Sequence, residues 1–147
     1  MNAYRKAAVM AASLALAWSV PGIAQNYPMT GGEYVEVSSI TIEDGHDVDY
    51  ANYLSSQWRA NQEYAKSQGW ITGYEVLANV NKRPGEADLI LVVRYKSIPE
   101  GAEGERRGAQ MREHLKQTDT QMAAASGDRA KYRHVLGSTL WQVLNFK

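Results

Sequence analysis

The chain has 147 residues, with 16 basic and 16 acidic side chains and no cysteine. The lack of cysteine excludes disulfides, thiolate catalysis and thiolate-bound metal or iron–sulfur centres. The balanced charge, without any basic block, argues against nucleic-acid binding, which depends on neutralising phosphates. We therefore expect no nucleic acid as a partner, and no cofactor.

The first 24 residues have the pattern of a secretory signal peptide. Arg5 and Lys6 precede the apolar stretch 7–20, and the segment 22–24 (Gly-Ile-Ala) supplies small residues for cleavage. The apolar stretch is shorter than the roughly 20 residues that span a bilayer. We expect cleavage after Ala24, a periplasmic or secreted protein, and no stable membrane insertion.

The remainder predicts one domain, 33–147, after a flexible lead-in at 25–32. Residues 34–42 are rich in β-branched side chains and predict a first strand. Apolar residues at steps of three and four then predict a helix from about Asp47 to Gln68, which Gly69 ends.

Two further strands, 70–80 and 88–95, are joined by a turn containing Pro84 and Gly85 and should form a hairpin. A loop at 98–104 leads to a second predicted helix, 105–125. The segment 129–137 is ambiguous, and residues 139–146 predict the last strand.

The order β-α-β-β-α-β predicts an α+β, ferredoxin-like fold with a four-stranded antiparallel sheet and two helices on one face. Right-handed crossovers place the first and third strands in the centre. A sheet covered on one face should alternate apolar and polar side chains, but strand 88–95 is apolar on both faces. Strand 139–146 likewise directs Leu140 and Trp141 to opposite faces. Either a second copy covers the open face, sheet against sheet, or that face forms a ligand groove.

With this order of elements, its central apolar strand and its closing strand, the segment 34–146 resembles the dimeric α+β barrel superfamily. The segment 58–95 also resembles part of a group of small exported bacterial proteins of unassigned function. The superfamily includes cofactor-free monooxygenases, haem-degrading and haem-dependent enzymes, lactone isomerases and stress proteins. The resemblance implies a homodimer with a pocket between sheet and helices, and it leaves the activity open.

Asn61 is the first candidate catalytic residue. In the superfamily, cofactor-free oxygenation tends to use Asn and Trp with a Tyr or Arg in the pocket, and Trp58 and Asn61 share one face of the first helix. An Asn on an apolar face requires a hydrogen-bond partner. Alternatively, the helix is rotated so that Asn61 lies at the margin.

Arg94 and His114 are the other two catalytic candidates. Arg94 lies in the most apolar strand and requires a carboxylate, for which Glu36 and Glu75 are available. It forms either a structural ion pair or a clamp for an anionic ligand. His114 lies next to the apolar face of the second helix, where it is either a base or haem ligand, or an exposed histidine.

The remaining histidines are less informative. His46 lies among Asp44, Asp47 and Asp49, which indicates either a hard-cation site or a solvated turn that caps the helix. We favour the turn and expect no metal. His134 is expected at the surface or at a dimer edge.

The function that these patterns favour is an exported homodimer that binds a small apolar or aromatic molecule, without assigned chemistry. The alternative is a cofactor-independent monooxygenase or isomerase, which requires Asn61, Arg94 and His114 to converge on one cavity. Haem binding through His114 is a third hypothesis. Amphipathic aromatic residues suit ligand pockets, and the candidates here are Tyr34, Trp58, Trp70 and Trp141.

Overall fold

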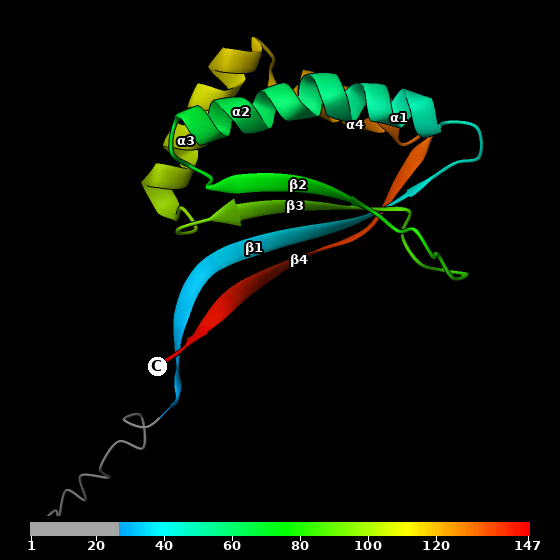
Figure 1. Ribbon diagram of the computed structural model, residues 1–147. Coiled ribbons are helices and arrows are strands. Elements are labelled where there is room, and N and C mark those ends of the chain that lie inside the picture. The colour runs from blue at the N-terminus through cyan, green and yellow to red at the C-terminus, as the bar shows by residue number, and fades with distance from the viewer. Residues whose placement is uncertain (1–26) are drawn as a thin grey trace, which may run out of the picture.

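The computed structural model describes residues 27–147, so the predicted signal peptide lies outside the described residues. The chain forms an antiparallel sheet in the order β2-β3-β1-β4, with helices on one face (Figure 1). This is the predicted ferredoxin-like α+β fold, with the first and third strands in the centre. The strands are β1 (Met29–Ile42), β2 (Gly73–Ala78), β3 (Leu89–Tyr95) and β4 (Arg133–Phe146).

The first predicted helix is one continuous helical segment in three parts. These are α1 (Asp47–Tyr53), a single π-helical stretch η2 (Leu54–Trp58), and α2 (Arg59–Ser67). Tyr50 and Leu54 from this segment are buried against Ile40 of β1 and form the centre of the core. The apolar steps of three and four in the sequence include Leu54 and Ala65, which are buried, but they pass through exposed Ala51 rather than its buried neighbour Tyr50.

The prediction of one continuous helix over residues 105–125 is wrong. The structure has two helices, α3 (Gly101–Leu115) and α4 (Asp119–Arg129). The chain breaks at Lys116, which adopts a left-handed conformation with φ 53°, and Thr118 then caps α4 in a capping box with Gln121. None of the helices in residues 27–147 combines the length and apolar character needed to cross a membrane.

β1 and β4 are both longer than the sequence predicts. β1 begins at Met29, inside the segment expected to be a flexible lead-in, and β4 begins at Arg133 rather than Thr139. On the N-terminal side of Tyr34, β1 pairs only with β4, from Gly31 opposite Leu144 to Met29 opposite Phe146. This ribbon projects past β2 and β3 (Figure 1). Mutual backbone hydrogen bonding is what orders these two ends.

Side chains alternate between the two faces of the sheet where β1 pairs with β3, from Tyr34 to Ile40, while the β1–β4 ladder has register shifts between Gly31 and Tyr34 and between Ser39 and Ile40. Ile40 pairs with Leu89 in register, and both face the helices, so Val35 and Val37 of β1 face away from them. β4 carries apolar residues on both faces, as predicted: Leu140 lies opposite Glu36, and Trp141 lies opposite Val35. Leu140 is 51% exposed and Trp141 61% exposed. Both faces of β4 are thus uncovered within one chain.

Asp88 fastens the β2–β3 hairpin to the central strand β1. Its carboxylate accepts hydrogen bonds from Lys82 Nζ at 2.7 Å and from the Ile42 backbone N–H at 2.9 Å. Its own N–H donates to the Ile40 carbonyl at 2.8 Å. Lys82 and the Ile42 N–H hold the pKa of the Asp88 carboxyl below its ordinary value, because both favour the ionised form.

Replacing Asp88 with Asn should lower the free energy of unfolding at pH 7 by about 1 to 2 kcal/mol, since a hydrogen-bonded charge is lost. A carboxyl with a lowered pKa stabilises the fold above its ordinary pKa of 3.8 and ceases to do so as the pH falls through its folded pKa. The deficit of D88N should therefore shrink on acidification. Urea unfolding at pH 7 and pH 3 measures both effects. D128N is the control, because the Asp128–Lys131 pair is fully exposed; equal losses in the two variants would contradict the assignment.

Candidate functional site

An apolar hollow lies between the helical segment 47–67 and the sheet. Its volume is about 460 Å³, which is within the usual range of small-molecule pockets. We call it the Trp58 groove. It is lined by Ile42, Asp47, Ala51, Leu54, Ser55, Trp58, Arg59, Tyr74, Val76 and Leu89.

The π-helical stretch forms the roof of the Trp58 groove. The Arg59 N–H reaches back five residues to the Leu54 carbonyl, which is the bond that defines a π-turn. Ser56 Oγ donates to the Asn52 carbonyl at 2.5 Å, and Ser55 Oγ donates to the same carbonyl at 3.2 Å. Both serine hydroxyls thus bond back to a carbonyl in the preceding turn of the helical segment.

The wider turn has a consequence for the side chains. Tyr50, Leu54 and Trp58 are spaced by four residues, and in a regular α-helix each step of four rotates the side chain by about 40° around the axis. A π-turn contains more residues per turn and offsets this drift, so Leu54 and Trp58 both line the groove. Single π-turns inside α-helices are frequent at functional sites.

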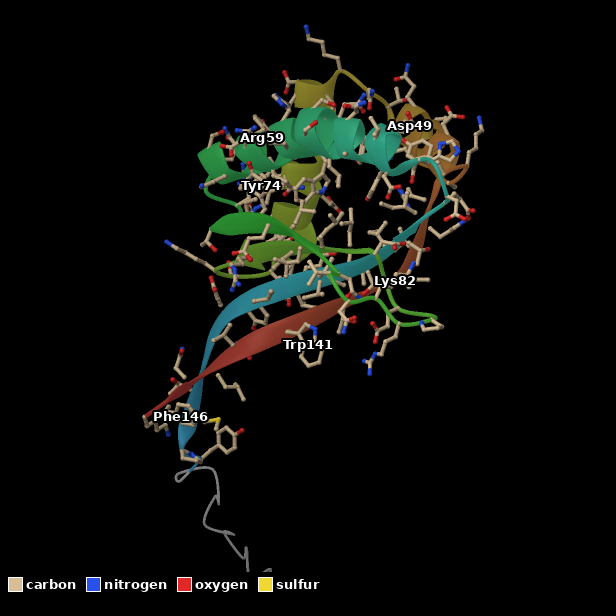
Figure 2. All side chains as sticks on the ribbon, turned by 45° about the vertical axis from the view of Figure 1, so that its right-hand side comes forward. Asp49, Arg59, Tyr74, Lys82, Trp141 and Phe146 are labelled. Atoms are coloured by element: carbon tan, nitrogen blue, oxygen red, sulfur yellow. The ribbon has the colours of Figure 1, made fainter. Side chains whose placement is uncertain are left out.

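An aromatic pair closes one wall of the groove. The Trp58 ring meets the Tyr74 ring edge to face, with 5.4 Å between centroids. Edge-to-face packing is a favourable arrangement of two aromatic rings. Figure 2 shows Arg59 and Tyr74 at the same end of the helical segment, where the groove is polar.

Tyr74 carries a hydrogen-bonded phenol at this polar end. Its hydroxyl donates to the Glu63 carboxylate of α2. That hydrogen bond raises the pKa of the Tyr74 phenol, because the acceptor stabilises the protonated form, while Arg59 acts in the opposite direction. Tyr74 is therefore a neutral donor at physiological pH. Because the single Tyr74 O–H is donated to Glu63, the Arg59 guanidinium is the group that suits a ligand with a hydrogen-bond acceptor or an anionic group at this end.

The sequence missed Tyr74, Arg59 and Glu63 as members of the site. One signal was available, because alternation along the predicted strand 70–80 places Tyr74 and Val76 on one face. The register with β3, where Tyr74 lies opposite Val93, decides whether that face is the one toward the helices.

Of the predicted site residues, Trp58 lines the groove and the three catalytic candidates do not. Asn61 is half-buried on α2, and His114 is exposed on α3 with its ring stacked on Tyr64 at 3.7 Å between centroids. Neither of them, nor Arg94, lines the Trp58 groove.

Arg94 lies on the face of the sheet opposite to the helices. It forms ion pairs with Glu33 at 3.0 Å and Glu75 at 3.7 Å, and the sequence correctly suggested Glu75. Glu36 is not its partner. Arg94 lies opposite Val35 in the ladder, so the next residue, Glu36, points to the other face. Since Asn61 and His114 are on the helical layer, the three candidates do not converge.

The other predicted aromatic residues are dispersed. Trp70 packs edge to face on Tyr64 at 5.5 Å, and the Arg107 guanidinium lies 5.9 Å from the Trp70 ring. Tyr34 lies on β1 between Tyr95 and Gln142. Trp141 lies on the helix-free face of the sheet (Figure 2).

The two remaining histidines form carboxylate pairs at the surface. His46 Nδ1 lies 2.7 Å from Asp49 at the start of α1, and His134 Nε2 lies 2.6 Å from Glu43. Within residues 27–147, no three His, Cys, Asp or Glu side chains are grouped as metal ligands.

Comparison with known proteins adds only a general likeness of fold. No protein-family profile and no curated protein matches the chain. HapK from Hahella chejuensis is similar in structure, with 10% identity, a TM-score of 0.49, and coverage of 78% of this chain and 95% of that one. A "putative monooxygenase" from Shewanella loihica PV-4 is similar at 12% identity and a TM-score of 0.46, covering 79% and 98%. At these values the likeness says nothing about activity.

Replacing Glu63 with Gln should lower the pKa of the Tyr74 phenol, because the negatively charged acceptor that favours the protonated form is removed. The pKa is measured from the pH dependence of the Tyr74 Cζ chemical shift in tyrosine-labelled protein. Glu105→Gln on the exposed side of α3 is the control and should leave it unchanged. A Tyr74 titration that is the same in wild type and E63Q would contradict the proposed geometry.

Proposed function

We propose that this chain is an exported, homodimeric α+β barrel protein that binds a small apolar or aromatic molecule in the Trp58 groove. In this proposal residues 1–24 are the signal peptide, and the mature protein starts at Gln25. The observation that carries the binding proposal is the groove itself: a hollow of about 460 Å³ with mostly apolar walls and one aromatic pair. Burying such walls against an apolar ligand is favourable.

The distribution of polar and apolar side chains along the groove supports a ligand with one polar end. Arg59 offers donors and a positive charge at one end, while Leu54, Val76 and Leu89 form apolar walls. A flat apolar molecule that carries an acidic group matches this distribution.

The binding proposal can be tested with 8-anilinonaphthalene-1-sulfonate, an aromatic probe with an anionic group. Wild-type protein should bind the probe with saturable fluorescence enhancement. Ala51→Phe should weaken binding about tenfold or more, because the new ring fills the groove. Ala60→Phe is the matched control, since Ala60 is an exposed alanine of the same helical segment that does not line the groove.

Loss of binding in A51F with retention in A60F supports the proposal. Equal affinity in wild type and both variants would place the probe elsewhere and overturn it. Far-ultraviolet circular dichroism verifies that each variant is folded. If A51F does not fold, Arg59→Gln tests the same groove, and it should reduce affinity for the sulfonate while leaving the apolar walls intact.

The dimer proposal rests on the helix-free face of the sheet. Val35, Val37 and Trp141 lie there, and Trp141 is 61% exposed. A large exposed apolar side chain among valines on an open sheet indicates an interaction surface. A second copy of the same face would bury both sets of side chains, sheet against sheet.

Trp141→Glu should convert the dimer to a monomer, because a charge placed in an apolar interface is costly to bury. Leu140→Glu is the matched control: it is the adjacent, similarly exposed residue, on the opposite face of β4. Light scattering coupled to size exclusion gives the mass of each. A monomeric wild type, or equal dissociation in the two variants, would refute an interface on this face.

A further inference from the structure

A second hollow lies on the helix-facing side of the sheet, across β1, β3 and β4, and it differs from the Trp58 groove in its polar chemistry. Its volume is about 430 Å³, and it is lined by Glu36, Tyr95, Ile98, Pro99, Ser138 and Leu140. We call it the Glu36 site. It shares no lining residue with the Trp58 groove.

Glu36 is held in place by two hydroxyl groups. Tyr95 Oη donates to Glu36 Oε2 at 2.7 Å, and Ser138 Oγ donates to Glu36 Oε1 at 3.0 Å. Ser38 Oγ donates in turn to Ser138 Oγ at 3.1 Å. All four side chains lie on one face, because the ladder places Ser38 opposite Ser138 and Glu36 two residues away on the same strand.

The hydroxyl groups orient the carboxylate without neutralising it. Burial and the hydrogen bond to Glu36 raise the pKa of the Tyr95 phenol well above its ordinary value, so Tyr95 stays a donor. Each carboxylate oxygen accepts one of these bonds and keeps further acceptor capacity. The carboxylate is thus preorganised for a third donor.

No cation of the described residues accompanies this charge. Across residues 27–147, no Lys, Arg or His nitrogen lies within 4.0 Å of the Glu36 carboxylate. Arg94, on the other face of the same sheet, differs from Glu36 because it has two partners of opposite charge. A half-buried carboxylate without a counter-ion attracts a cationic group.

The remaining walls of the site are apolar and open to solvent. Leu140 is 51% exposed and Ile98 37% exposed, and Pro99 lies beside them. We propose that the Glu36 site binds a small organic amine, with the ammonium group on the Glu36 carboxylate and an apolar body over Leu140 and Ile98. The site is separate from the Trp58 groove and from the proposed dimer face, so it does not rest on either proposal.

Three probes with the same apolar body and different charge test the site: phenethylamine, 2-phenylethanol and hydrocinnamate. Titrations are followed by amide chemical shifts of the full mature protein in low salt. We expect saturable shifts with phenethylamine centred on Glu36, Tyr95 and Ser138. 2-Phenylethanol should bind about tenfold more weakly or worse, because it lacks the charge that strengthens the hydrogen bond to Glu36. Hydrocinnamate should not bind, because its carboxylate is repelled by the Glu36 carboxylate.

Glu36→Gln should weaken phenethylamine binding about tenfold or more, since it removes the charge and preserves the shape. Glu75→Gln is the control, a carboxylate on the opposite face whose partner Arg94 retains Glu33. If E36Q does not fold, Leu140→Trp obstructs the site from an exposed position and should also abolish the shifts. Equal binding of amine and alcohol, retained binding in E36Q, or shifts centred on Trp58 would each overturn the proposal. Shifts centred on Trp58 would overturn the proposed amine site but would leave the proposed ligand binding in the Trp58 groove unaffected.

Discussion

The alternation of side chains along β1 is the constraint on which the rest of the structure depends. Ile40 points toward the helices and packs on Tyr50 and Leu54, so every second residue of β1 from Tyr34 to Ile40 faces the same side. Val35 and Val37 are thereby assigned to the helix-free face. A slip of one residue in register would exchange the two sets and dismantle the core, so the register is strongly specified.

The same constraint separates the charged groups of the sheet. Arg94, opposite Val35, is on the helix-free face, where two carboxylates neutralise it. Glu36 is on the helix-facing side, where only hydroxyl groups reach it. Two adjacent pairs of the β1–β3 ladder, Val35 with Arg94 and Glu36 with Val93, thus place a cation with carboxylate partners on one face and an anion without a cationic partner among residues 27–147 on the other. The chemistry that each face offers to a partner follows from that separation.

The helical segment 47–67 adds a second constraint, through its π-turn. The turn lets Tyr50, Leu54 and Trp58 remain directed at the sheet over a longer stretch than a regular helix allows. Tyr50 and Leu54 fill the space above Ile40, whereas Trp58 reaches the β2 side and packs on Tyr74. The groove is the space left between these two contacts. The π-turn therefore determines the position of both the aromatic wall and the polar end of the groove.

Much of the fold was predictable from the sequence because strands and amphipathic helices are local periodic patterns. The hairpin of β2 and β3, the burial of Leu54 and Ala65, and the order of elements all follow from spacing and turn chemistry, whereas the burial of Tyr50 does not. The sheet order then follows from the handedness of crossovers. The break at Lys116 interrupts an apolar period that continues across it in the sequence, so the period alone predicts one helix, whereas the Thr118 capping box starts a second.

The sites depend on information that no single segment contains. Trp58 was identifiable from its helical position, but its contact with Tyr74 depends on how the helix lies across β2. By itself, the sequence determined which residues are apolar, charged or turn-forming, and with that the α+β class. The tertiary structure alone decided that Arg94 pairs with Glu33 and Glu75, and that Glu36 faces Tyr95 and Ser138. The physical reason is that local periodicity specifies a strand, whereas strand register, fixed by contacts far apart in the chain, decides which side chains meet.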